Sequence, residues 1–142
     1  MNPLRSLPSY EQFVYALQRQ NSEILRSTLV VIRRGAALAV LSGELEFPKG
    51  IRLVVREKLS FAGIPGRIQG YGYEVWQNDE QLYWYDSQPH PGDPNLATTD
   101  PHHKHVPPNI KHHRIPAPGL QFDEPNLPFL ISEIVQLRES QG

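Results

Sequence analysis

Residues 41–57 read Leu-Ser-Gly-Glu-Leu-Glu-Phe-Pro-Lys-Gly-Ile-Arg-Leu-Val-Val-Arg-Glu. Apolar and polar residues alternate on both sides of the central Pro-Lys-Gly, which is typical of two β-strands joined by a tight turn. The alternation places the odd-numbered residues of both strands on one face and most polar residues on the other. This stretch therefore predicts an antiparallel hairpin with one face packed on the core.

Further strands are predicted on both sides of the hairpin. Residues 27–33 are rich in β-branched side chains, and residues 67–77 and 81–86 alternate between apolar and polar positions around a short turn. The connections have hairpin length, so consecutive strands are expected to be neighbours. Residues 24–87 therefore predict an antiparallel meander of about five strands.

Amphipathic helices are predicted at both ends of the chain. Residues 9–19 carry apolar side chains at i, i+3, i+4 and i+7, and Ser9 with Gln12 matches a capping box. Residues 126–140 show a similar stripe, with Asn126 as the N-cap. We expect both helices to pack on one face of the sheet, in a single α+β domain that spans residues 1–142.

The composition excludes several classes of site. The chain has no cysteine, so disulfides, thiolate catalysis and cysteine-based zinc sites are ruled out. Its formal net charge of −1 gives no global field for binding nucleic acid, so any phosphate contact must come from a local patch. The N-terminus lacks the apolar run of a signal peptide, and no apolar stretch is long enough to span a membrane. A soluble, cytoplasmic protein is expected.

Residues 88–119 are dense in Pro and His and are expected to form a long loop before the last helix. The segment Pro101-His102-His103-Lys104-His105 holds three of the six histidines of the chain. His90 precedes this segment, and His112 and His113 follow it as solvent-exposed linker residues. Imidazole has the unperturbed pKa nearest neutrality, so it transfers protons or binds metal ions without special tuning.

The alternation of residues along the strands adds two carboxylates to the candidate site. It also indicates which histidines face the same side. Glu57 shares the buried face of Ile51, Leu53 and Val55, so it either has a partner or lies at the solvated rim. Asp86 ends the strand over residues 81–86 in a similar way. Both carboxylates are expected at one sheet edge, beside the root of the loop. On an extended segment, His103 and His105 face one side, while His102 and Lys104 face the other.

Together these residues suit acid–base chemistry on a phosphodiester, with one histidine taking a proton and another donating one. The candidate catalytic residues are Glu57, Asp86, His90, His103 and His105. Arg56 and Lys104 are the candidate substrate-binding cations. A divalent metal ion held by His90, His103 and His105 with a carboxylate is an equally open interpretation.

Plainer interpretations stand beside these. The histidine-rich segment is also typical of a flexible loop that binds metal weakly, and Asp86 is also suited to orienting a backbone turn. The aromatic residues of the strands favour cross-strand packing over base stacking. The alternative function is a non-catalytic module that binds a protein or a metal ion through the loop.

An ordered set of short motifs resembles the TumE family. The matching segments are Leu45–Phe47, Gly50, Leu53–Glu57, Tyr71–Tyr73, Tyr85–Asp86, Pro89–His90 and Pro101–His105. The resemblance covers roughly residues 37–106, plus a generic C-terminal helix. The resemblance implies a toxin of a toxin–antitoxin pair, encoded beside a small DNA-binding antitoxin. RNA is the target that the cluster of histidines, carboxylates and lysine suggests. Trp84 stands where the family pattern has an arginine before Tyr-Asp, which removes one candidate phosphate contact.

Overall fold

The computed structural model describes residues 2–87, 102–107, 114–117 and 119–141. Two α-helices, α1 (Leu7–Gln20) and α2 (Leu127–Ser140), accompany short 3₁₀ turns at Pro3–Arg5 and Pro48–Gly50. The described strands are β1 (Arg26–Ser27), β2 (Val30–Arg34), β3 (Leu38–Glu46), β4 (Ile51–Ser60), β5 (Arg67–Gln77), β6 (Glu80–Asp86), β7 (His103–His105) and β8 (Arg114–Pro116).

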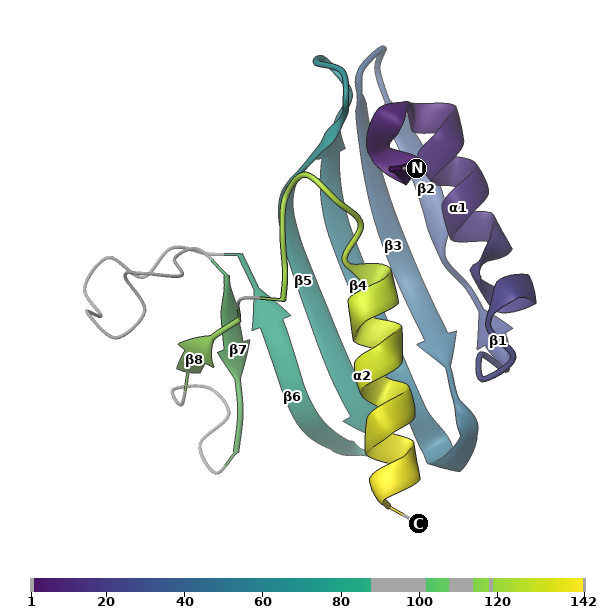
Figure 1. Cartoon of the computed structure of the whole chain (residues 1–142), viewed down its shortest axis with the longest axis vertical. Helices are drawn as coiled ribbons and strands as arrows, with labels where there is room; N and C mark the ends of the chain where they lie inside the picture. Colours follow the sequence, from purple (N-terminus) through teal and green to yellow (C-terminus); the bar gives the residue numbers. More distant parts are fainter. Residues whose placement is uncertain (1, 88–101, 108–113, 118, 142) are drawn as a thin grey trace.

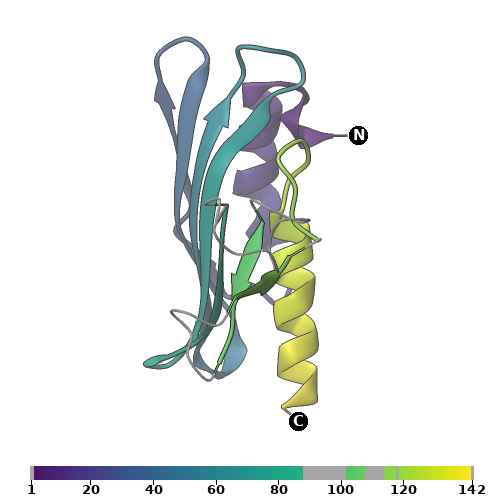
Figure 2. The same cartoon turned by 90° about the vertical axis from the view of Figure 1, so that its left-hand side faces the viewer.

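These strands form one antiparallel sheet in the order β1-β3-β4-β5-β6-β7-β8, with β2 also paired to β3 (Figure 1). Both helices lie on the same face of the sheet, and no described helix or strand covers the other face (Figure 2). We call these the helix face and the open face. The α+β fold with both helices on one face of an antiparallel sheet is confirmed.

The sheet has more strands than the five that the sequence predicts. The stretch predicted as one strand over residues 27–33 divides into β1 and β2, because Thr28 and Leu29 cross directly over Gly43 of β3. A Cβ on Gly43 would lie 2.5 Å from the carbonyl oxygen of Thr28, and Gly43 has a φ of +135° that favours glycine.

The histidine-rich segment adds two further strands. Residues 88–119 are predicted as a loop, yet β7 and β8 lie within this range and extend the sheet beyond β6. A strand of three residues is too short to show a detectable period, so its formation depends on the neighbour with which it pairs.

Helix α1 begins earlier than predicted. Ser6, not Ser9, is the N-cap, and its hydroxyl accepts a hydrogen bond of 3.1 Å from the backbone N–H of Ser9. Pro8 lies in the first turn, where its missing N–H costs nothing. Ser9 is therefore inside the helix, and the predicted capping box with Gln12 is wrong.

Helix α2 follows Asn126, as predicted, but the Asn126 side chain does not cap it. Its amide oxygen accepts from the backbone N–H of Gln121 at 2.8 Å, and its amide nitrogen donates to the hydroxyl of Tyr73 at 3.1 Å. Asn126 therefore ties the start of α2 to β5 of the sheet.

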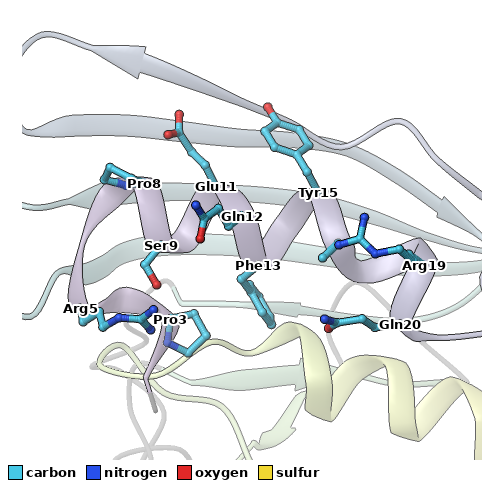
Figure 3. A pocket seen from close by; sticks show the side chains of 11 residues that line it. Pro3, Arg5, Pro8, Ser9, Glu11, Gln12, Phe13, Tyr15, Arg19 and Gln20 are labelled. Carbon is cyan, nitrogen blue, oxygen red and sulfur yellow. The ribbon is translucent and has the colours of Figure 1, made fainter.

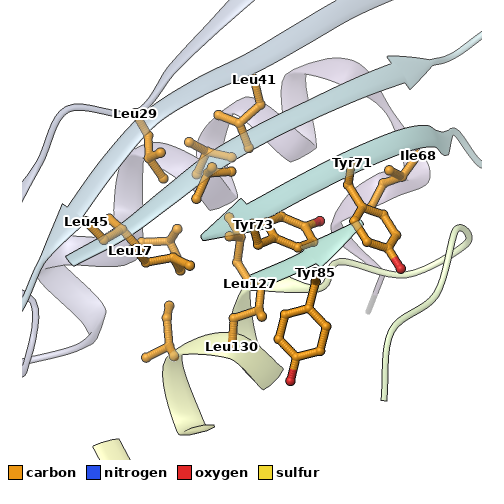
Figure 4. Close-up of a cluster of buried hydrophobic side chains, with 14 of the residues drawn as sticks. Leu17, Leu29, Leu41, Leu45, Ile68, Tyr71, Tyr73, Tyr85, Leu127 and Leu130 are labelled. Atoms are coloured by element: carbon orange, nitrogen blue, oxygen red, sulfur yellow. The ribbon is translucent and has the colours of Figure 1, made fainter. Parts of the chain in front are cut away.

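The core lies between the helix face and the two helices (Figure 4). The odd-numbered positions of β3 and β4, apart from Gly43, are buried there, as the alternation predicts. Leu17 of α1 and Leu127 and Leu130 of α2 pack against them, and each buried side chain of this size contributes about 1.5–3 kcal/mol to folding. Among the described residues, no helix is long and apolar enough to cross a membrane.

Candidate functional site

A row of residues crosses the open face at the level of Asp86. The strand registers pair Arg56 of β4 with Gly72 of β5, Gly72 with Asp86 of β6, and Asp86 with His103 of β7. Residues paired in this way project from the same face of a sheet. Strand β7 pairs with β6 over its whole length, and this pairing brings the histidine segment to the Asp86 carboxylate.

Two imidazoles contact that carboxylate. The Nε2 atom of His105 lies 3.2 Å from Oδ2 of Asp86, and Nδ1 of His103 lies 3.8 Å from Oδ1. Both histidines are almost fully buried, with 2% and 0% exposure, whereas 14% of the Asp86 side chain is exposed. The His105 ring also stacks on Trp84, with ring centroids 3.7 Å apart. Asp86 is therefore the member of this cluster that faces outward.

Side chains that alternate along β7 make contacts on both faces of the sheet and hold the strand in place. As predicted, His103 and His105 face one side while His102 and Lys104 face the other. On the helix face, Nδ1 of His102 lies 2.5 Å from the hydroxyl of Tyr71, and burial, followed by the charge of His103, lowers the pKa of His102. A strand of only three residues is fixed here by side-chain contacts on both of its faces.

Lys104 does not join the Asp86 cluster. Its Nζ lies 3.1 Å from the Glu133 carboxylate of α2 and 4.3 Å from the centre of the Tyr83 ring. The Tyr85 hydroxyl donates to the same carboxylate, and burial raises the pKa of Tyr85. Lys104 therefore connects β7 to α2 on the helix face, away from any substrate on the open face.

Glu57 also lies on the helix face, because β4 pairs it with Tyr71 rather than with Gly72. It lies inside β4, not at a strand end or a rim, and it is 1% exposed. The hydroxyls of Tyr10 and Tyr73 donate to its two carboxylate oxygens. Burial raises the pKa of Glu57, although both hydrogen bonds oppose that shift. The predicted grouping of Glu57 with Asp86 is therefore wrong: the two carboxylates are on opposite faces.

The Glu57 network joins the three parts of the fold. Tyr10 belongs to α1, Tyr73 belongs to β5, and the Tyr73 hydroxyl accepts from Asn126 at the start of α2. Burial and the neighbouring Glu57 charge keep the pKa of Tyr10 and Tyr73 well above that of a free tyrosine. Glu57 thus anchors both helices to the sheet, which satisfies a carboxylate that would otherwise be costly to bury.

The open face carries a groove of about 600 Å³ beside Asp86. Its floor is Gly70 and Gly72 of β5, and its two sides carry Arg56 and Lys58 of β4 and Trp84 and Asp86 of β6. A Cβ on Gly72 would lie 2.6 Å from Nη2 of Arg56, so the guanidinium lies across this glycine. The open face therefore presents cations, a carboxylate and an aromatic ring around one depression.

A larger depression of about 890 Å³ runs along α1 on the helix side (Figure 3). It is lined by α1 and the segment before it, and Phe13, Tyr15 and Arg19 are among its side chains. None of the residues predicted for the site borders it. The larger depression and the predicted site residues therefore lie apart.

One predicted residue, His90, lies outside the described residues, as do His112 and His113. The predicted metal set of His90, His103 and His105 consequently stays a prediction. In the part of the chain that the structure describes, no group of three or more His, Asp or Glu side chains is arranged to hold a metal ion.

A protein-family model described as Toxin TumE matches residues 14–138, which is most of the chain. The chain belongs to the TumE family. The match extends the resemblance to the second half of α1 and to β1 and β2. A TumE protein is a toxin of a toxin–antitoxin system, and this implies an antitoxin partner. Neither a curated protein nor a solved structure matches the chain.

Sequence reasoning missed two residues of the groove in this TumE protein. Lys58 shares its face with Arg56 by simple alternation, so strand parity was a sufficient signal for it. Trp84 was interpreted as packing, but it borders the groove and stacks on His105. Residues 84 and 86 of a strand project from the same face, so the sequence already indicated that Trp84 lies on the same face as Asp86.

Proposed function

We propose that this TumE toxin acts on RNA, through acid–base chemistry at Asp86 with His105 behind it. The observation that carries the proposal is the Asp86–His105 pair at the side of a groove whose other side is Arg56 and Lys58. Of the predicted catalytic residues, Asp86, His103 and His105 belong to this site, and Glu57 is assigned to the fold. Arg56 keeps its role as a substrate-binding cation, and Lys58 takes the place of Lys104.

The reaction that suits these groups is transesterification of a ribonucleotide. The 2′-oxygen of the ribose attacks the adjacent phosphorus, and the bond from phosphorus to the 5′-oxygen breaks, leaving a 2′,3′-cyclic phosphate. The proton of the 2′-hydroxyl passes to Asp86 and its imidazole partner, and the leaving 5′-oxygen takes a proton from solvent. Arg56 stabilises the negative charge that develops on the phosphoryl oxygens.

In the cell, the toxin is proposed to be cytoplasmic and neutralised by a small DNA-binding antitoxin encoded beside it. Family membership supports an antitoxin in general. RNA is the cytoplasmic polymer that carries the 2′-hydroxyl this chemistry needs.

The test is incubation of purified protein with RNA and with DNA of the same sequence. We expect cleavage of RNA, with cyclic phosphate ends, and intact DNA, because DNA lacks the attacking hydroxyl. Asp86→Asn should reduce the rate about 100-fold or more. Glu44→Gln is the matched control, since Glu44 is an open-face carboxylate that pairs with Arg52 and does not line the groove. Intact RNA over a range of pH and added divalent metals would count against the proposal.

A non-catalytic binding role is the second candidate. The burial of His103 and His105 favours it, because fully covered imidazoles are suited to holding β7 on the sheet. This alternative expects a stable complex with RNA or protein and no turnover. Growth of a bacterial host after induced expression separates the two: only the catalytic proposal expects Asp86→Asn, at matched soluble level, to abolish growth arrest while binding remains.

A further inference from the structure

The open face divides into two halves that differ in how their charges are paired. Towards the turn between β3 and β4, Arg52 pairs with Glu44 at 2.9 Å and Arg26 with Glu46 at 3.5 Å. Glu74, which the register pairs with Trp84 at the border between the halves, accepts hydrogen bonds from the side chains of Trp76 and Gln81. The two arginines of this half are therefore paired with carboxylates, and Glu74 is held by neutral donors.

The other half is cationic. The registers bring four basic side chains to its rows, all of them exposed: Arg34, Arg56, Lys58 and Arg67. None of the four forms an ion pair with any described residue. In a chain with a formal net charge of −1, this cluster is a local feature and gives the surface an attraction for anions.

The groove lies within this cationic half. Because Gly72 has no side chain, the Arg56 guanidinium lies across the backbone of β5 and brings its charge to the floor of the groove. The His105 ring stacks on one side of Trp84 with an interplanar angle of 10°. This stack fixes the orientation of the indole, which borders the groove.

We propose that the cationic half binds single-stranded RNA, which crosses the sheet from β2 towards β6. Phosphates lie near Arg34, Arg56, Lys58 and Arg67, and one base stacks on Trp84. This inference rests on the proposed function for its choice of RNA and deepens it by naming the form of the RNA and the residues that hold it. We define this surface, Arg34, Arg56, Lys58, Arg67 and Trp84, as the RNA track.

The shape of the track selects a single strand. Arg56 and Lys58 are two residues apart on β4, roughly 7 Å along the strand, so together they form a cationic band across the path of an extended RNA chain. A duplex keeps its bases stacked inside the helix, so none of them reaches an aromatic ring on a shallow surface. An unpaired strand exposes every base to such stacking.

Binding is measured with a fluorescently labelled single-stranded RNA and the Asp86→Asn protein, in which cleavage does not interfere. The logarithm of the binding constant should fall linearly with the logarithm of the salt concentration. Arg56→Gln should reduce the magnitude of that slope by about 0.7, the value for one lost phosphate contact on a single strand. Arg52→Gln is the control, because Arg52 is a paired arginine of the other half, and it should leave the slope unchanged.

Trp84→Ala should weaken binding roughly 5- to 150-fold, the loss expected for one stacked base. Trp84→Phe should retain most of the affinity because a ring remains, and this variant also controls for damage to the fold. Duplex RNA of the same sequence should bind more weakly than the single strand.

Equal binding of duplex and single strand, or equal effects of Arg52→Gln and Arg56→Gln, overturns the track. The proposal also fails if the toxin binds an acidic protein partner on this face and binds no RNA. The two proposals fail separately. If wild type cuts RNA while Arg56→Gln and Trp84→Ala bind like the parent protein, the track is wrong and the chemistry stands. If binding follows the expectations but wild type never cuts, the track stands and the chemistry fails.

Discussion

The two faces of the sheet give a carboxylate opposite surroundings. On the helix face, Glu57 is 1% exposed and each of its oxygens accepts a hydrogen bond from a tyrosine. On the open face, Asp86 is partly exposed, borders a groove and has imidazoles behind it. Both residues end or interrupt an apolar pattern in the sequence, yet their surroundings have little in common.

The difference separates a residue that builds the fold from one that is available for chemistry. A buried carboxylate whose hydrogen bonds are all made inside the protein has nothing left to offer a ligand. A carboxylate at a groove, beside basic residues that form no ion pair with any described residue, retains both access and unsatisfied binding capacity. The following predictions test whether this contrast holds, beginning with the largest effect.

Glu57→Ala should lower the free energy of unfolding by about 2–5 kcal/mol. The substitution leaves two buried tyrosine hydroxyls without their acceptor and opens a cavity between α1 and the sheet. Urea unfolding at neutral pH measures the loss. Asp86→Ala is the comparison from the open face and should cost about 1 kcal/mol or less. Equal losses for the two variants would remove the contrast between the faces.

Asp86→Asn should slow RNA cleavage about 100-fold or more with little change in stability. His105→Ala should slow cleavage to a similar degree but should also lower stability, because it removes a buried ring that stacks on Trp84. Because the two side chains act as one unit at 3.2 Å, the double variant should be no slower than the slower single variant. Initial rates of the three variants, measured beside their unfolding curves, check this. Additive losses would show that Asp86 and His105 act independently.

The free energy of unfolding should depend on pH through the titration of Glu57. Its pKa is raised by burial, so the folded state keeps a proton that the unfolded state has already lost. The stabilisation is complete below the ordinary pKa of Glu, near 4.5, and is lost as pH rises through the higher pKa of the folded state. In that window the slope approaches about 1.4 kcal/mol per pH unit.

Glu57→Gln isolates this contribution, because it removes the titrating group and keeps one acceptor for the tyrosines. The stability of the wild type relative to this variant should fall as pH rises above about 4.5. The lowered pKa of His102 acts in both proteins and cancels in the comparison. A relative stability that is flat or rises with pH contradicts the assignment of a raised pKa to Glu57.

Lys104→Ala should have the smallest effect. It removes a partly exposed ion pair with Glu133 and the contacts of Nζ with the tyrosine rings, which together stabilise by roughly 1 kcal/mol. The melting temperature should drop slightly, and the slope of RNA binding against salt should not change. A reduced slope would place Lys104 in contact with RNA and would assign the helix face a part in binding.

Most of the individual elements follow from the sequence, because their signals are local. The period-two pattern on either side of residues 48–50 predicts the hairpin of β3 and β4, and the apolar stripes predict both helices. The alternation in residues 102–105 predicts which histidines share a face. Strands β7 and β8 escaped prediction, since each has three residues and depends on the sheet for its conformation.

Parity within one strand is therefore determined by the sequence alone, and it assigns Glu57 to the face of Leu53 and Val55. Only the tertiary structure decided how the parities of different strands combine. Glu57 pairs with Tyr71 and Asp86 pairs with Gly72, which are adjacent positions of β5. Adjacent residues of a strand project from opposite faces, so a register difference of one residue separates the two carboxylates. Register is set by the packing of the whole sheet against its helices, and no single strand encodes it.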